Sequence, residues 1–363
     1  MKKSFLRIAS HITIAFIMFY GYLIAKGFND WGNLSSFDPL LVPALSAGLF
    51  LSIHVHVFLH EGGHFLFGKL SGYQLVSFQV RHYKYSQADH SLHHMQATSP
   101  LLAGQCLMAP PEGDYAELPY RSYLLGGIMA NALTGTILYC LAFLMELKTG
   151  SLFVLFSLVP VWMTLANLLP KAQNDGALLR EASRSLPARR LLFQQLEMAR
   201  LIEEKVPFAD LPDAYFENIN DAQYQKTFLV DYFYMVAYVR ALGELDFEEA
   251  DSLLQTFSAK RPVEESVYWP VYMMESLFCD ALFGRIANAE EKYNQIQAQP
   301  LLKRYWIANN RIRAAYAFFC HTDIAETKKL LGKAPATAQD SSKEMQTSIE
   351  LRLYRWLNSY FEH

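Results

Sequence analysis

The strongest chemical signal in the sequence is the segment His60-Glu61-Gly62-Gly63-His64, an HExxH pattern. Residues four apart lie on one face of a helix, about one turn from each other, so His60 and His64 can both offer a ring nitrogen to one zinc ion. Glu61 projects beside them, where its carboxylate can take a proton from an attacking water. The pattern predicts a hydrolytic site that holds one Zn²⁺ per chain.

This pattern ends an apolar segment that is long enough to cross a membrane. The chain is 52% hydrophobic and 18% charged, and only 17 of its 67 charged residues fall among the first 170. A bilayer core of about 30 Å needs roughly 20 mostly apolar residues, and four segments qualify: 8–24, 40–70, 123–147 and 152–169. Histidine and glutamate within such a span are costly unless they are paired, bind a metal or face water. The cluster is therefore a functional candidate, with a purely structural polar cluster as the alternative.

Basic residues near the ends of the spans indicate the orientation. They gather at the amino terminus, in the loop between the second and third spans and after the fourth span, whereas the other two loops hold only Lys26 and Lys148. Because Lys and Arg favour the cytoplasmic side, both termini and the long middle loop are expected in the cytoplasm of a bacterial cell, with the chain in its cell membrane as a multi-pass protein. The net charge is −3, and the sequence contains no basic stripe, so no nucleic acid partner is implied.

A hydrolytic zinc ion usually takes three protein ligands and leaves one position for water. Asp175 is the candidate third ligand, because it follows the fourth span on the side of the membrane where the HExxH pattern is expected. The segment Asn174-Asp175-Gly176 is by itself also a turn signal, and both interpretations stay open.

These two segments together resemble the site-2 proteases, intramembrane zinc metalloproteases that cut membrane-embedded substrates. That family pairs HExxH on one core transmembrane helix with an Asn-x-x-Pro-x-x-x-x-Asp-Gly stretch on the third. The second stretch is matched here by Asn167, Pro170, Asp175 and Gly176. The segment from Gly126 to Asn131 also looks like a small-residue stretch of the middle core helix, and such residues let membrane helices pack closely.

The resemblance implies a role for each matched residue. His60, His64 and Asp175 would bind zinc. Glu61 would activate the water, and Asn167 would lie near the site, steadying the substrate carbonyl or the oxyanion. The chain departs from many members of the family in the polar residues just before Asp175 and in having no PDZ-like insertion.

The other histidines have two interpretations each. His56 lies one turn before His60 and is either a buried histidine bonded to a backbone carbonyl or a partner of the metal site. The middle loop carries His82, His90, His93 and His94, which either belong to a solvated loop or supply an inhibitory ligand to the zinc.

The middle loop begins with residues 73–85, which are rich in aromatic and β-branched residues and partly alternate in polarity. This pattern predicts a small β-hairpin. Because a protease must hold its substrate extended, an exposed strand edge at Phe78 and Val80 could receive the substrate by strand addition. A hairpin that merely packs against the helices is the alternative.

The chain after residue 180 has a different composition and a helical pattern almost throughout. Three similar junctions occur at 242–250, 283–290 and 321–326, with Ala250, Ala289 and Ala325 recurring 39 and 36 residues apart. They are similar to tetratricopeptide-type helical repeats, whose concave faces suit peptide or protein partners. A compact bundle that only stabilises the enzyme is the alternative.

The sequence thus predicts an all-α polytopic membrane protein of about four transmembrane helices, with a small β-hairpin in its middle loop. Residues 1–180 form the transmembrane metalloprotease domain, and residues 181–363 form a soluble, cytoplasmic helical-repeat domain. The expected function is hydrolysis of peptide bonds in or near transmembrane segments of membrane-embedded proteins or peptides. The alternative is a catalytically silent scaffold in the lipid bilayer that recruits protein partners through its helical repeats.

Overall fold

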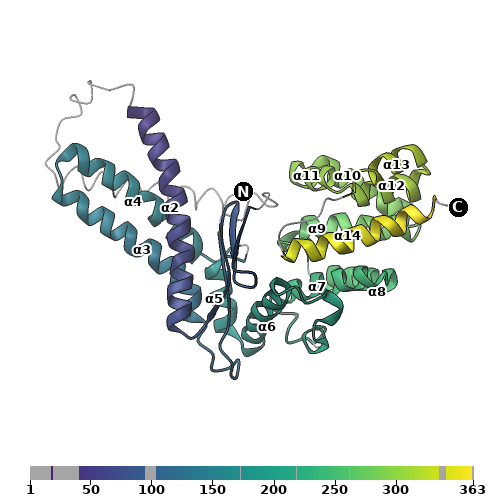
Figure 1. The fold of residues 1–363 in the computed structure, drawn as a ribbon, viewed down its shortest axis with the longest axis horizontal. Coiled ribbons are helices and arrows are strands. Elements are labelled where there is room, and N and C mark those ends of the chain that lie inside the picture. Colours follow the sequence, from purple (N-terminus) through teal and green to yellow (C-terminus); the bar gives the residue numbers. More distant parts are fainter. Residues whose placement is uncertain are drawn as a thin grey trace. The chain divides into compact units, whose positions relative to one another are not determined.

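The computed structural model describes Met18 and residues 41–94, 104–171, 173–217, 219–260, 262–334 and 341–361. These residues are mostly helical, with one small antiparallel sheet (Figure 1). The chain divides into two compact units. The first comprises Met1–Gln87 and Gln96–Arg180, and the second comprises Ala88–Met95 and Glu181–His363. The predicted span at 8–24 lies outside the described residues except for Met18.

Three long helices dominate the first unit: α2 (Leu41–Leu70), α3 (Arg121–Leu144) and α4 (Leu147–Leu168). They confirm the helices predicted at 40–70, 123–147 and 152–169. Among the described residues, two helices are long and apolar enough to cross a membrane, namely Arg121–Leu144 and Thr149–Leu168. A fourfold crossing of the membrane stays a prediction.

Large apolar side chains lie exposed along the outer surfaces of these three helices. Phe50 and Leu51 of α2 are 62% and 63% exposed, Leu133 of α3 is 62% exposed and Trp162 of α4 is 53% exposed. Soluble proteins rarely leave large contiguous apolar patches in water. A hydrocarbon environment for these surfaces stays a prediction.

Glycines bring α2 and α3 into backbone contact at the HExxH segment. A Cβ on Gly63 would lie 2.3 Å from the Gly126 carbonyl oxygen, and a Cβ on Gly126 would lie 2.5 Å from the Gly63 carbonyl oxygen. No side chain fits between the helices at this crossing, whereas a Cβ on Gly62 would meet nothing within 4 Å. Gly63 is thus the glycine of the pattern that helix packing requires.

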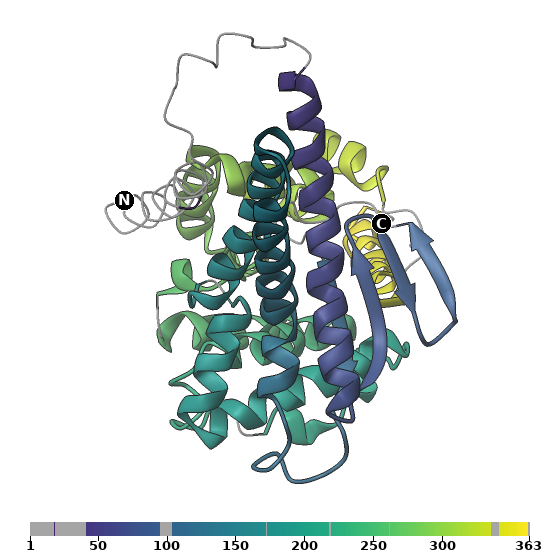
Figure 2. The same ribbon diagram turned by 90° about the vertical axis from the view of Figure 1, so that its left-hand side faces the viewer.

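The middle loop folds into a sheet larger than the predicted hairpin. Its strands are β1 (Gln74–Val80), β2 (Tyr83–Ser86), β3 (Ser91–His94) and β4 (Gly104–Ala109), in the order β3-β2-β1-β4. Strand β1 pairs antiparallel with both β2 and β4, and Figure 2 shows these strands beside α2. The predicted hairpin lacks strand β4, which comes from a later part of the loop and pairs with β1. The alternation of polar and apolar residues within one strand cannot reveal such a distant partner.

The prediction that Phe78 and Val80 lie on an exposed edge of the sheet is wrong. Phe78 is paired with Tyr85 on one side and Cys106 on the other, so β1 is an inner strand. Strand β4 is the edge of the sheet on the other side of β1.

Apart from the segment that carries β3, the second unit is mostly helical, with a long connection from Glu204 to Leu229 between its first two complete helices. Its α-helices follow from the end of α5 (Asp175–Arg184): α6 (Leu186–Glu203), α7 (Val230–Glu244), α8 (Phe247–Lys260), α9 (Trp269–Leu282), α10 (Ile286–Ala298), α11 (Pro300–Ala308), α12 (Asn310–His321), α13 (Ile324–Leu331) and α14 (Ser341–Ser359). Short 3₁₀ turns occur at Phe208–Asp210, Asp213–Tyr215 and Val263–Glu265. Helices α7 and α8, α9 and α10, and α12 and α13 pack as consecutive pairs.

The three predicted junctions are the turns within these pairs. Each contains a residue with left-handed backbone two positions before the next helix: Leu245 with φ 63°, Gly284 with φ 70° and Thr322 with φ 55°. A left-handed residue is a common way to end a helix and reverse the chain. The predicted repetition of the junctions is therefore present in the backbone.

One predicted repeat position is wrong. Ala250 and Ala289 are each the fourth residue of their helix and are fully buried. In α13 the fourth residue is Thr327, which is also fully buried, whereas Ala325 is exposed. Residues of similar size occupy the same packing position, and Ala325 matched the pattern by identity alone.

A network of two ion pairs and one tyrosine hydrogen bond joins four helices of the second unit. Arg311 of α12 is 1% exposed and donates to Glu275 of α9 at 2.7 Å and to Glu350 of α14 at 2.9 Å. The Tyr238 hydroxyl of α7 donates to Glu275 at 2.6 Å.

Candidate metal centre

The structure brings the three predicted metal ligands together. His60 Nε2 lies 3.1 Å from Asp175 Oδ2 and 3.3 Å from His64 Nε2. His64 Nε2 lies 3.4 Å from Asp175 Oδ2. Within the described part of the chain, this is the group of His, Cys, Asp and Glu side chains that could hold a metal ion.

The spacing of these three donor atoms suits a small cation. Zinc bonds of about 2.0–2.1 Å in a tetrahedral site place neighbouring donors about 3.3 Å apart. The observed separations of 3.1, 3.3 and 3.4 Å form a triangle of that size. Two imidazole nitrogens and one carboxylate oxygen are also the donor types found in hydrolytic zinc sites, which keep a fourth position open.

Asn174 holds the start of α5 against the end of α4 and so positions Asp175. Its side-chain amide donates to the carbonyl oxygens of Ala166 at 2.7 Å and Leu169 at 2.9 Å. Its Oδ1 accepts a hydrogen bond from the backbone N–H of Ala177 at 3.0 Å and caps α5. The predicted turn is therefore present, and Asp175 takes part in the cluster as its third member.

The two imidazoles keep the Asp175 carboxylate ionised. Burial raises the pKa of this carboxyl, but its hydrogen bonds with His60 and His64 outweigh burial and hold the pKa well below its ordinary value. A metal ion would likewise bind the ionised form of this carboxyl.

Helix α3 contacts the far side of both imidazoles. His64 Nδ1 lies 2.7 Å from the Tyr123 carbonyl oxygen, and His60 Nδ1 lies 3.2 Å from the Asn131 amide. Between these residues, a Cβ on Gly127 would lie 2.6 Å from His60 Cε1 and 2.6 Å from His64 Nε2. The rings therefore occupy the space that a larger residue would need.

Strand β4 lies directly against Glu61. The Glu61 side chain is buried, with the residue 6% exposed, and its carboxylate accepts a hydrogen bond from the backbone N–H of Cys106. A Cβ on Gly104 would lie 2.7 Å from Glu61 Oε1, so only glycine lets the strand approach this closely. The catalytic role of Glu61 stays a prediction.

Asn167 lies near Asp175, with its amide directed to its own helix. Its Nδ2 donates to the Met163 carbonyl oxygen at 3.1 Å. A Cβ on Gly176 would lie 2.6 Å from the Asn167 carbonyl oxygen, which shows how closely the end of α4 packs against α5. A contact of Asn167 with the substrate carbonyl or the oxyanion stays a prediction.

The remaining histidines have other partners. His56 is buried, and its Nδ1 lies 2.8 Å from the Ser52 carbonyl oxygen, as the interpretation of a backbone-bonded histidine predicts. His93 pairs with Asp89 at 2.8 Å. In the described residues, none of the loop histidines joins the cluster of His60, His64 and Asp175.

Several contacts around the site were not predicted from the sequence. The contact of the Tyr123 carbonyl with His64 has no signal in the sequence, because every residue carries a carbonyl. Gly127 and Asn131 belong to the small-residue stretch of the middle core helix, but the sequence did not predict that they contact the imidazoles. Gly104 and Cys106 reach Glu61 only through the pairing of β4 with β1.

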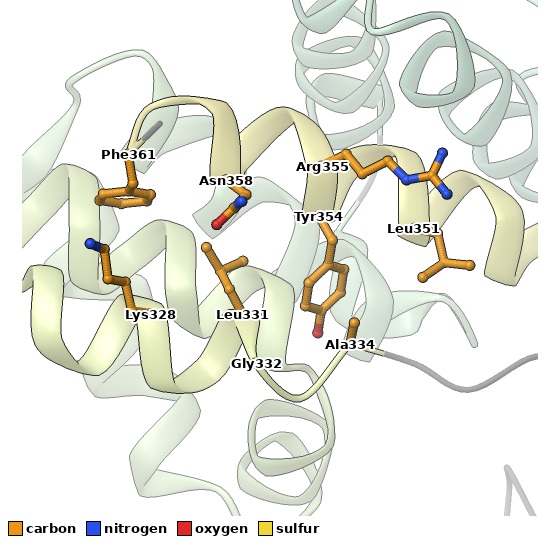
Figure 3. A pocket seen from close by; sticks show the side chains of 9 residues that line it. All are labelled: Lys328, Leu331, Gly332, Ala334, Leu351, Tyr354, Arg355, Asn358 and Phe361. Atoms are coloured by element: carbon orange, nitrogen blue, oxygen red, sulfur yellow. The ribbon is translucent and has the colours of Figure 1, made fainter. Parts of the chain in front are cut away.

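The second unit contains a hollow of different chemistry between α13 and α14, shown in Figure 3. Its volume is about 530 Å³, and its cations are Lys328 and Arg355. The Lys328 ammonium lies 5.8 Å from the centre of the Phe361 ring. Its described lining holds no carboxylate or imidazole.

We compared the chain with protein-family models, curated proteins and solved structures. None of them matches it.

Proposed function

We propose that the protein is an intramembrane zinc metalloendopeptidase of the site-2 protease type. The observation that supports this most is the triangle of donor atoms from His60, His64 and Asp175. Asp175 lies 115 residues after His60 in the sequence. An HExxH pattern occurs by chance in many chains. A third ligand at the correct distance from a distant segment makes a chance match a poor explanation.

The chemistry follows from the positions of the side chains. A zinc ion held by the triangle would act as a Lewis acid on the peptide carbonyl and would make water a stronger nucleophile at neutral pH. Glu61 takes the proton of the attacking water and passes it to the leaving amine. The buried setting of Glu61 keeps bulk water from competing for that proton.

The membrane location is proposed from the surface of the helical bundle. Exposed apolar side chains on α2, α3 and α4 would face lipid, while the polar cluster lies buried between the helices. Substrates of such a site are membrane-embedded proteins or peptides. The second unit would present a surface to a protein partner in the cytoplasm.

Strand β4 is the best candidate for aligning the substrate. A peptide bond must leave its helix before it can be attacked, and an edge strand can hold an extended segment by main-chain hydrogen bonds. Strand β4 is an edge strand, and its Cys106 N–H is bonded to Glu61. A substrate strand added there would compete for this N–H and would release the Glu61 carboxylate for catalysis.

Zinc content of the detergent-purified chain tests the proposed site. We expect about one zinc per wild-type chain and loss of that zinc in both His60→Ala and Asp175→Ala, because two ligands hold the ion far more weakly than three. His93→Ala is the matched control, since it removes a histidine outside the cluster and should keep the zinc. A wild-type chain without zinc, or an Asp175→Ala chain that binds it as tightly, contradicts the proposal and favours the scaffold.

A further inference from the structure

Helix α3 supplies no candidate metal ligand, yet it contacts both imidazoles through residues spaced by four. Tyr123, Gly127 and Asn131 therefore lie along one stripe of the helix. The first bonds His64, the second leaves room for both rings, and the third bonds His60. The stripe forms a seat for the two imidazoles.

The contact with Tyr123 fixes the tautomer of His64. A backbone carbonyl can only accept a hydrogen bond, so His64 Nδ1 carries a proton, and Nε2 is the nitrogen whose lone pair a metal would take. His64 Nε2 is the atom that faces His60 and Asp175. The Tyr123 carbonyl thus fixes the orientation of the His64 ring, with Nε2 toward His60 and Asp175.

His60 needs the same arrangement, because its Nε2 is also the atom in the triangle. Its Nδ1 must then carry a proton and find an acceptor. The Asn131 amide lies 3.2 Å away, and a half-turn of this amide exchanges its oxygen and nitrogen. Asn131 is fully buried, and its other amide atom has no partner in the described structure, so the half-turn breaks no other hydrogen bond.

We infer that Asn131 is a positioning residue whose Oδ1 accepts the Nδ1 proton of His60, so that both imidazoles present Nε2 to the metal from the seat on α3. This inference rests on the proposed zinc site. Such outer partners of metal-bound histidines typically contribute 10–100-fold to metal affinity.

Two substitutions of Asn131 separate the acceptor from the space that the side chain fills. Asn131→Leu keeps a similar volume and removes the acceptor, so zinc affinity measured by chelator competition should fall by about 10–100-fold. Asn131→Asp keeps an acceptor oxygen and should bind zinc at least nearly as tightly as wild type. Thr134→Val is the matched control, because the Thr134 hydroxyl bonds only carbonyls of its own helix in the described contacts, at 2.9 and 3.1 Å.

A cobalt-substituted chain gives a second measurement that does not depend on activity. The visible absorption of bound Co²⁺ reports the geometry of its ligands, and we expect it to change in Asn131→Leu and to persist in Asn131→Asp and Thr134→Val. Equal zinc affinity and the same cobalt spectrum in wild type and Asn131→Leu overturn the inference while leaving the zinc site intact. Absence of metal binding in wild type and Thr134→Val overturns the proposed function and the inference with it.

Discussion

Glu61→Gln is expected to lower peptide-bond hydrolysis by about 10²–10⁴-fold, the contribution that a positioned general base makes to such reactions. The amide has nearly the shape of the carboxylate but cannot accept the proton of the attacking water. Because Glu61 is not a member of the donor triangle, zinc content should stay at about one per chain. The measurements are cleavage of a membrane-embedded substrate in detergent or liposomes and zinc per chain on the same preparation.

Glu112→Gln is the control for this experiment. Glu112 is an exposed carboxylate in the loop between β4 and α3, and its loss should leave both cleavage and zinc unchanged. Full activity of Glu61→Gln would remove Glu61 from the role of general base. Loss of zinc in this variant would instead assign Glu61 a part in holding the metal.

Arg311→Met is expected to destabilise the second unit by about 3–5 kcal/mol, the typical cost of removing one partner from a buried ion pair. Burial lowers the pKa of Arg311, but the charges of Glu275 and Glu350 outweigh it and hold the pKa well above its ordinary value, so the guanidinium is charged. Methionine fills much of the space and leaves Glu275 without its cation. The loss should appear in two measurements on the full chain. The free energy of unfolding in urea should fall, and the hydrogen-exchange protection of α9, α12 and α14 should be reduced.

Arg304→Met provides the comparison, because Arg304 is an exposed arginine of the neighbouring helix α11. A substitution of that kind usually changes stability by no more than about 0.5 kcal/mol. If Arg311→Met and Arg304→Met unfold alike, the network joining the helices contributes little. Zinc content should be unaffected in both variants, since the proposed ligands lie before residue 181.

The two parts of the candidate site differ in how far sequence could reach them. His60 and His64 are four residues apart on one helix, so local geometry alone brings their rings together. Nothing local connects Asp175 with α2, so its prediction needed the expected membrane side of the fourth span and the resemblance to a family. The sequence marked Gly127 and Asn131 only as part of a small-residue stretch, and it did not predict their contacts with the imidazoles. The third contact of the seat comes from a backbone carbonyl, which every residue carries.

The fold shows the same division between local and distant determinants. The helices between residues 40 and 169 follow from long apolar runs, and the paired helices of the second unit follow from amphipathic periodicity and turns. The place of β4 beside β1 depends on a contact between residues far apart in the chain. The equivalence of Thr327 with Ala250 and Ala289 depends on where α13 begins, which the local composition at 321–326 did not reveal.

The distance along the chain between His60 and Asp175 also affects how the protein is made. These ligands are 115 residues apart, so a ribosome adding 5–20 residues per second needs roughly 6–23 s to pass from one to the other. During that interval α2 and α3 can already associate through Gly63 and Gly126, but the nascent chain has only two of its three ligands. An unfinished or prematurely terminated chain therefore cannot complete the metal centre, and the hydrolytic capacity we propose would begin only after the last of the long apolar helices has been synthesised.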